Sequence, residues 1–273
     1  MIKNGVLKVK ADHRDFSYHR TYGSITPVQF TECNFDVGFP VGNQAADGLD
    51  YGCTGYTQAG LCQDIDKIQY VPKFTYDETL QMEGISPSDP TFEKVGCDIR
   101  DSLNSTIVYG VQAVGETPAE ALNHRRGAYY AVEQVAGMDM FDSIRSALQQ
   151  NQRSVSFCTP WYAIFAIPQQ GIIQTPPSYD TTFATWHNSR ICGWKLINGV
   201  PYLINESHQG AQYGVNGFCY FPREVVNQLL SINGSGAFTL APFTGATIQN
   251  VQLTILQTII SFAHMILAKL KGN

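Results

Sequence analysis

The chain changes character near residue 154, and this change constrains its fold more than any other feature. Before that point the sequence favours helices, which we expect over residues 53–70, 89–103, 117–135 and 140–149. After it, runs rich in β-branched and aromatic residues predict strands over residues 154–168, 171–175, 184–197, 200–205 and 217–222. Helices followed by strands indicate an α+β fold, with two lobes and a cleft between them.

Two local signals sharpen this outline. Asn198-Gly199 separates two of the expected strands, and both residues tolerate a positive φ, so we expect a tight hairpin there. Thr117 and Glu120 have the spacing of a capping box, which predicts that a helix begins at this point.

The charge balance argues against nucleic acid as a partner. The chain has 273 residues, with 18 Lys+Arg against 23 Asp+Glu and a net charge of −5. A dedicated nucleic-acid binder needs a concentrated basic face, which these numbers do not supply. Hydrophobic residues make up 44% of the chain, enough for a sizeable core.

We divide the chain into three parts. Residues 1–22 are charged and form a surface arm, residues 23–240 form the main domain, and residues 241–273 form an apolar tail. The first part lacks the apolar run of a secretory signal, so we expect a cytoplasmic or virion-associated protein.

The tail contains a long uncharged stretch. A helix over residues 251–268 would extend about 27 Å, which is borderline for crossing a bilayer. Its polar residues recur every three or four positions and line one narrow stripe. We therefore expect residues 248–270 to form a hydrophobic helix. It would pack on the chain's own domain, on a second copy or an assembly partner, or on a membrane.

The seven cysteines do not form a metal or redox motif. No two of them have the C-x₂₋₄-C spacing of a zinc site, and we expect no metal and no cofactor. Their number is odd, and without a secretory signal we expect most of them to be reduced.

Cys53 is the cysteine with the most suggestive surroundings. It follows Gly52 at the start of an expected helix, where the positive end of the helix dipole favours thiolate over thiol. His187 lies 134 residues further on and Asn205 lies 152 residues further on. This order and spacing match the pattern described for papain and the cathepsins.

Four stretches resemble papain-like cysteine peptidases, over roughly residues 20–235. They follow the family's order: GNQAADGLDYGCTGYTQAG, FDSIRSALQQNQRSVSFCTPWYAIFAIPQQGIIQT, TWHNSRICGW and PYLINESHQGAQYGVNGFCYF. The resemblance implies a papain-like two-lobed fold, with a helical lobe, an antiparallel β lobe and the active site between them. It also implies a peptide or protein substrate, and the source is expected to be bacterial or a bacteriophage.

The resemblance implies a role for each matching residue. Cys53 would be the nucleophile and His187 the base, with Asn205 orienting the imidazole. Gln44 would donate a side-chain N–H to the oxyanion hole.

The sequence departs from the family at four places, the first being that no cysteine lies just before Cys53 to form the family's disulfide there. Gln44 precedes Cys53 by nine residues, whereas the family has six. The family's tryptophan after the asparagine is absent, so His208 or Trp186 would have to shield the imidazole. We also expect no long inhibitory propeptide of the family's kind, so any restraint would come from the arm or the tail.

Strand register tests whether Asn205 can reach His187. A two-residue hairpin places Asn205 opposite Cys192, about 16 Å along the strand from His187. A bulge, a longer loop or a bend must close that gap.

Two other functions stay open. One is a catalytically degenerate papain-like fold that serves as a structural or binding component, for example of a phage particle. The other is a different Cys–His acyl-transfer enzyme, such as a transglutaminase-like enzyme or a cell-wall amidase, which would need an aspartate as the orienting group. The peptidase hypothesis requires Cys53 to face a groove rather than to lie sealed inside the protein.

Overall fold

The computed structural model describes residues 5–10, 12, 15–27 and 31–242. Its helices are α1 (Tyr18–Tyr22), α2 (Cys53–Asp66), α3 (Pro72–Met82), α4 (Ile99–Val108), α5 (Met140–Asn151) and α6 (Arg223–Ser231). Its strands are β1 (Cys33–Asn34), β2 (Arg126–Ala131), β3 (Val155–Tyr162), β4 (Ala184–Ile197), β5 (Val200–Glu206), β6 (Phe218–Phe221) and β7 (Gly236–Pro242). Short 3₁₀ turns cover Pro118–His124, Ala163–Ala166 and Thr181–Phe183.

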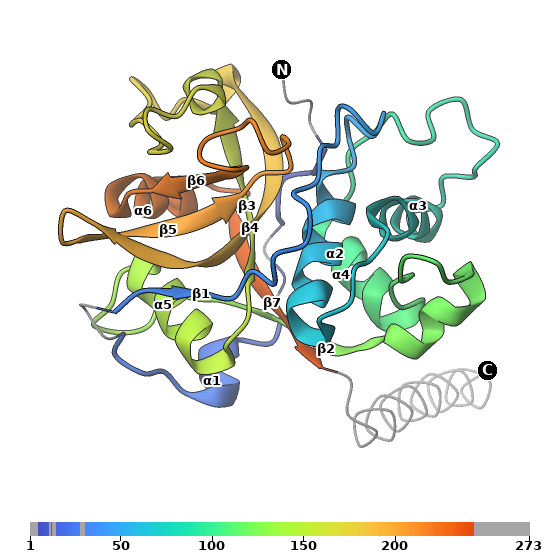
Figure 1. Cartoon of the computed structure of the whole chain (residues 1–273), viewed down its shortest axis with the longest axis horizontal. Coiled ribbons are helices and arrows are strands. Elements are labelled where there is room, and N and C mark those ends of the chain that lie inside the picture. The colour runs from blue at the N-terminus through green and yellow to red at the C-terminus, as the bar shows by residue number, and fades with distance from the viewer. Residues whose placement is uncertain (1–4, 11, 13–14, 28–30, 243–273) are drawn as a thin grey trace, which may run out of the picture.

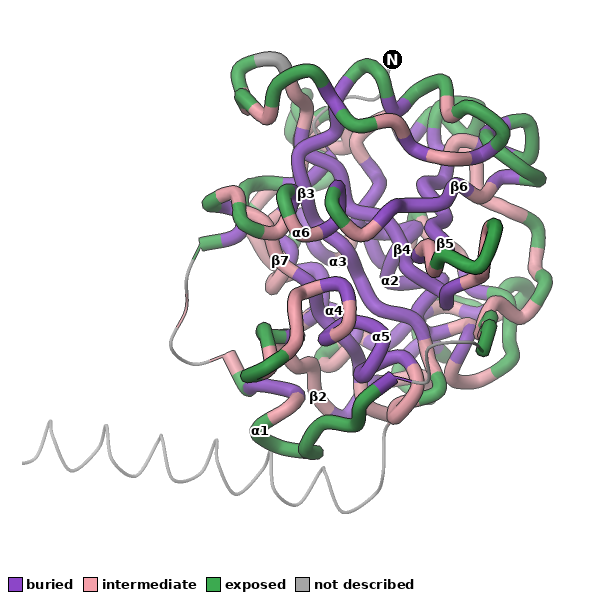
Figure 2. The backbone as a smooth tube through the Cα atoms, turned by 90° about the vertical axis from the view of Figure 1, so that its left-hand side faces the viewer, coloured by how far each residue is buried: buried purple, intermediate pink, exposed green. Residues whose placement is uncertain are grey.

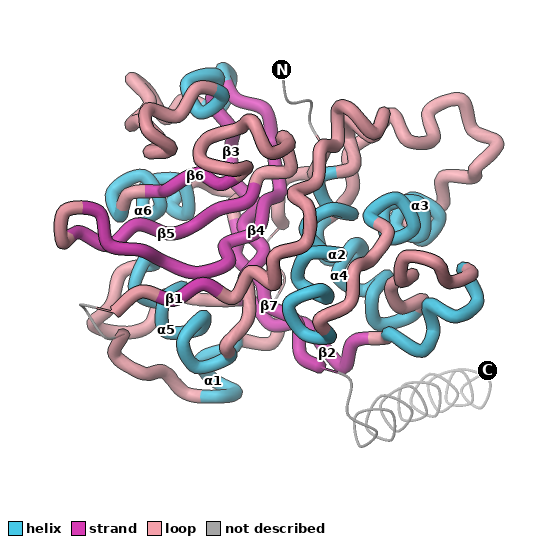
Figure 3. The backbone as a smooth tube through the Cα atoms, viewed as in Figure 1, coloured by secondary structure: helices cyan, strands magenta, loops and turns pink. Residues whose placement is uncertain are grey.

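The strands form one antiparallel sheet in the order β2-β7-β3-β4-β5-β6, with β1 added beside β4. Helices α2, α3 and α4 gather on one side of the molecule, and most of the sheet lies with α1, α5 and α6 on the other (Figure 1). The loop that leads from β1 to α2 runs between these two parts (Figure 3). The expected α+β architecture with two lobes is confirmed.

The second half of the chain follows the sequence prediction closely. Strands β3, β4, β5 and β6 lie within the predicted ranges or one residue from them. Asn198 and Gly199 form the hairpin with φ of 52° and 78°. Central strands β3 and β4 are buried along most of their length (Figure 2), including the polar run 187–190 of β4. The run 171–175 was predicted as a strand, but it contributes only isolated bridges at Ile172.

In the first half of the chain, two helix predictions are wrong. Residues 117–135 do not form one helix, because the Thr117–Glu120 capping box begins a 3₁₀ turn and the chain then pairs with β7 as β2. Aromatic residues in this stretch favour the sheet once a partner strand is available. Residues 89–103 are mostly turns, and α4 begins only after Asp98 caps it.

Helix α2 lies close to its neighbours because of two glycines. A Cβ on Gly55 would lie 2.4 Å from the carbonyl oxygen of Pro72, and one on Gly60 would lie 2.9 Å from Cδ of Arg190. Neither neighbour could tolerate that approach. Small residues in CTGYTQAGL therefore let the helix approach both α3 and β4.

The N-terminal arm is not the surface arm that its charged residues predict. Val6 and Tyr18 are buried, and both belong to hydrophobic clusters of the main domain. The predicted helix over residues 248–270 lies outside the described residues. Within the described residues, no helix is long and apolar enough to cross a membrane.

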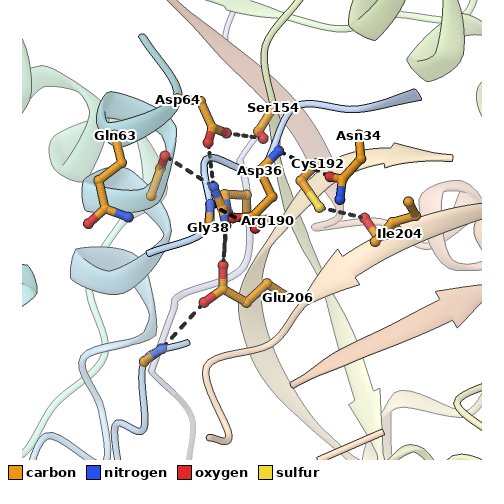
Figure 4. A network of polar contacts seen from close by, with 12 residues as sticks. Asn34, Asp36, Gly38, Gln63, Asp64, Ser154, Arg190, Cys192, Ile204 and Glu206 are labelled. Carbon is orange, nitrogen blue, oxygen red and sulfur yellow. Dashed lines mark hydrogen bonds and ion pairs between the residues drawn. The ribbon is translucent and has the colours of Figure 1, made fainter. Parts of the chain in front are cut away.

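A buried arginine joins the two parts of the molecule. Arg190 of β4 donates to Asp64 of α2 at 2.6 Å and, through Nε, to Glu206 of β5 at 3.0 Å (Figure 4). It also donates to Asp36 at 2.6 Å. Burial raises the pKa of the Asp64 carboxyl to about 6, although the charge of Arg190 opposes this. At Glu206 burial raises the pKa, but the charges and hydrogen bonds of Arg190 and His208 together outweigh it and hold the pKa of that carboxyl well below its usual range.

We predict that Arg190→Met lowers the free energy of unfolding by about 3–5 kcal/mol, because it leaves buried carboxylates unpaired. Urea unfolding followed by circular dichroism measures the change. Arg20→Met is the matched control, since Arg20 is 85% exposed and pairs with Glu133 only at 3.6 Å. Equal stability of the two variants would contradict a structural role for the network.

Candidate active site

Cys53 is the first residue of α2, as the sequence predicts. Its sulfur accepts a hydrogen bond from the backbone N–H of Asn188 at 3.4 Å. Asn188 is the residue after His187 in β4, so the structure brings the two candidate reactive residues to the same place. Both Cys53 and His187 are 0% exposed.

His187 presents two different ring nitrogens. Nε2 lies 3.0 Å from the carbonyl oxygen of Ser207. Nδ1 is buried and has no hydrogen-bond partner among the described residues. One face of the site is closed by Trp161, whose ring centroid is 4.8 Å from that of His187 at an interplanar angle of 68°.

Burial controls the ionisation of both groups. It raises the pKa of the Cys53 thiol to about 12, although backbone N–H groups of Asn188, Thr54 and Cys53 favour the thiolate. Burial also lowers the pKa of His187 to about 3, and the nearby His208 adds to the effect. The expected thiolate at the helix N-terminus is therefore not the form this conformation favours. In this conformation Cys53 is a neutral thiol and His187 a neutral imidazole, with no hydrogen bond between Nδ1 and the sulfur.

The structure does not bring Asn205 to His187, so its assignment as the orienting residue is wrong. A bulge shifts Asn205 opposite Ile191, still four residues along β4 from His187. Its side-chain amide donates to the hydroxyl of Ser189 at 2.7 Å. The bulge thus shortens the gap by one residue without closing it.

Two contacts of His187 were missed from the sequence. The Ser207 carbonyl belongs to the backbone, so no residue type indicates it. Strand register indicates the segment, because counting pairs back from Ile197↔Val200 brings the residues after Glu206 opposite His187. Trp161 could be found in the same way, because His187 pairs with Thr159, two residues before Trp161 on the same face. Trp186, one of the two expected shields, instead lies under the ammonium group of Lys8.

Gln44 lies near the segment that carries Ser207. Its backbone N–H donates to the carbonyl of His208 at 3.1 Å, and its side-chain Nε2 donates to the carbonyl of Asp50 at 3.0 Å. The Oε1 atom is buried without a partner among the described residues. The bond to Asp50 uses one of the two hydrogens on Nε2, and the oxyanion role of Gln44 stays a prediction.

The N-terminal arm covers the sulfur. A Cβ on Gly5 would lie 2.6 Å from Sγ of Cys53, so the backbone of the arm passes directly over the thiol. Gly5 accepts from the N–H of Cys97 at 3.3 Å, and the N–H of Leu7 donates back to Cys97 at 2.8 Å. The arm therefore runs as a short strand parallel to the Cys97 segment.

The arm is also bound to the sheet side of the molecule. The N–H of Val9 donates to the carbonyl of Gly234 at 2.8 Å. Val6 and Val9 are buried, whereas Leu7 between them is 51% exposed. Burial of Cys53 thus comes partly from a short peptide bound on both sides.

The described residues include no cluster of three histidine, cysteine, aspartate or glutamate side chains that could hold a metal ion. All seven cysteines are free thiols. The groups that this site offers are a thiol, an imidazole and the backbone N–H groups at the start of α2.

Comparisons with known proteins give the fold a context. No family model and no curated protein matches the chain. Solved structures do: xylellain, a cysteine protease from Xylella fastidiosa, is similar with a TM-score of 0.65 and 18% identity, over 89% of this chain and 98% of that one. Procathepsin L2 from the Tenebrio molitor larval midgut has a TM-score of 0.63 and 15% identity, over 88% and 78% of the two chains.

The bromelain protease from Ananas comosus is also similar, with a TM-score of 0.51 and 15% identity over 82% of this chain and 97% of that one. These similarities agree with a helical part beside an antiparallel sheet. The chain therefore has the papain-like fold of these cysteine proteases.

Proposed function

We propose that the chain is a cysteine peptidase whose active site is held closed by its N-terminal arm. The observation that carries the proposal is the placement of Cys53 at the N-terminus of α2 against the backbone of the His187 strand. A thiol at that position, beside an imidazole with a free nitrogen, is the pair that nucleophilic acyl transfer requires.

The mechanism follows from these atoms. Once the arm leaves, water reaches the site, the burial that keeps both groups neutral is relieved, and the proton of Cys53 moves to Nδ1 of His187. The thiolate attacks the carbonyl carbon of a peptide bond, and His187 returns the proton to the leaving amine. A thioester remains on Cys53, and water hydrolyses it with His187 as the base.

Backbone geometry supplies an oxyanion hole in this proposal. The N–H of Cys53 is one of the unpaired donors at the start of α2. Gln44 adds a side-chain N–H, since Nε2 carries two hydrogens and Asp50 uses only one. Each such donor is worth about 10²–10³ in rate.

A degenerate fold with a structural or binding role is the second candidate. The complete burial of Cys53 and His187 favours it, because an inert pair has no need of access. The peptidase and the degenerate fold differ in the reactivity that they predict for Cys53 when the arm is displaced.

We predict that the double variant Val6→Asp/Val9→Asp makes Cys53 reactive. Both side chains are buried, so a charge on each opposes docking of the arm. With limiting iodoacetamide near pH 6, peptide mass mapping should show preferential alkylation of Cys53. The preference should disappear when His187→Ala is added, because the thiolate then has no counter-charge.

Leu7→Asp is the matched control, since this arm residue is half exposed and its replacement leaves docking intact. Uniform slow alkylation of several cysteines in the double variant would contradict the peptidase proposal and support the inert fold.

We predict a graded loss of activity in the same arm-displaced background. Hydrolysis of fluorescent casein should fall by at least about 10³-fold in Cys53→Ala. It should fall by about 10²–10³-fold in Gln44→Ala, because one oxyanion donor is lost while the nucleophile stays. A Gln44→Ala variant with unchanged kcat would remove Gln44 from the mechanism.

A further inference from the structure

The imidazole of His187 needs an orienting group, and the structure offers one other than Asn205. Nε2 lies 3.0 Å from the Ser207 carbonyl oxygen. A carbonyl oxygen only accepts hydrogen bonds, so Nε2 must carry the hydrogen. The contact therefore specifies the tautomer as well as the position of the ring.

The other nitrogen is left free for chemistry. Burial holds the pKa of His187 far below neutrality, so the ring carries one proton, and Nε2 has it. Nδ1 then keeps a bare lone pair, with no partner among the described residues. The next residue in the chain, Asn188, already contacts the sulfur of Cys53. A free lone pair on His187, in the strand whose backbone contacts the sulfur, is what a base for this nucleophile needs.

The carbonyl is held by backbone pairing. Segment 207–210 runs antiparallel to segment 42–44, with Asn43 opposite Gln209. The N–H of Gly210 donates to the carbonyl of Gly42 at 2.9 Å, and the pairing also includes the backbone bond from Gln44 to His208. The same pairing therefore positions the Ser207 carbonyl and the backbone of the candidate oxyanion residue.

The side chain of His208 holds the same segment from the helix side. Its Nε2 lies 3.0 Å from the hydroxyl of Thr57 in α2, and its ring stacks on Tyr56 at 5.5 Å between centroids. Segment 207–210 is thus held between α2 and loop 42–44.

Trp161 also restricts the His187 ring, by packing against it. Its edge-to-face packing on His187 fits the electrostatics of two aromatic rings, and the indole is only 4% exposed. Because Trp161 packs against the His187 ring and Ser207 holds its Nε2 atom, the ring has little freedom to rotate.

We infer that the backbone carbonyl of Ser207, held by the pairing of segments 42–44 and 207–210 and backed by Trp161, is the positioning group of His187 and replaces a side-chain amide. The tautomer follows from the structure alone, whereas the kinetic consequence rests on the proposed peptidase function.

The tautomer is tested on the full-length wild-type chain. Nitrogen-15 NMR of histidine-labelled protein, with the His187 signals identified by comparison with His187→Gln, should show a neutral ring protonated at Nε2 between pH 5 and 8. The Hε2 proton should exchange slowly with water, because it is buried and hydrogen-bonded. Protonation at Nδ1, or a charged ring in this range, would overturn the inference.

The positioning role is tested by two glycine variants in the Val6→Asp/Val9→Asp background. Gly210 and Gly199 both have a left-handed backbone, with φ of 84° and 78°, so alanine strains each position alike. A Cβ at Gly210 would lie 2.7 Å from Nδ2 of Asn43 in the paired segment, whereas one at Gly199 would meet nothing within 4 Å. We expect Gly210→Ala to lower kcat at least tenfold with KM within about twofold, and Gly199→Ala to leave both unchanged.

Equal kcat values in Gly210→Ala and Gly199→Ala would overturn the positioning role. If neither the arm-displaced chain nor its variants hydrolyse casein or alkylate selectively at Cys53, the peptidase proposal fails instead. The NMR result then decides the inference by itself, because it needs no turnover.

Discussion

The contact between α2 and β4 is the constraint on which the site depends. Gly60 has no side chain, so Arg190 lies directly against the helix and reaches Asp64. This buried ion pair fixes the position of α2 along its own axis relative to β4. Three residues before Arg190 in the same strand, His187 is thereby brought level with the first turn of α2. The Asn188 N–H on the sulfur of Cys53 is the direct result.

Two opposing effects meet at that first turn. The unpaired N–H groups at the start of α2 favour a thiolate, whereas removal of water favours a thiol. In the described conformation burial prevails, and it moves the pKa of Cys53 up and the pKa of His187 down. The arm therefore does more than obstruct the site sterically. By excluding water it also disfavours the ion pair on which the proposed peptidase chemistry depends, so access and activation are coupled in this proposal.

The sequence was informative where local signals and tertiary structure agree. Asn198-Gly199 predicted the hairpin because its backbone conformation is intrinsic to those residues. The helix prediction for 117–135 failed because a capping box sets only the first turn, and pairing with β7 determines the conformation of the residues after it. The covering of Cys53 by Gly5 could not be foreseen either, because nothing local to a glycine shows what it packs against.

The candidate site shows the same division. Cys53 and His187 were proposed because a thiol and an imidazole are the groups that acyl transfer uses and because their spacing matches a known pattern. Asn205 was chosen by residue type. Strand register decides which residues face His187, and it places Asn205 opposite Ile191 instead. The orienting atom in the structure belongs to a peptide bond and is invisible to any search by residue type.

An orienting carbonyl changes how the altered motif after Asn205 should be judged. A side-chain orienter is lost with one substitution, so its absence usually indicates an inert site. A carbonyl is present whatever residue stands at position 207, and it depends only on the path of the backbone. That path is held here by the pairing with segment 42–44 and by the bond between His208 and Thr57. The absence of a contact between Asn205 and His187 is therefore weak evidence for a degenerate fold, and the decisive question is whether Cys53 and His187 form an ion pair once the arm has left.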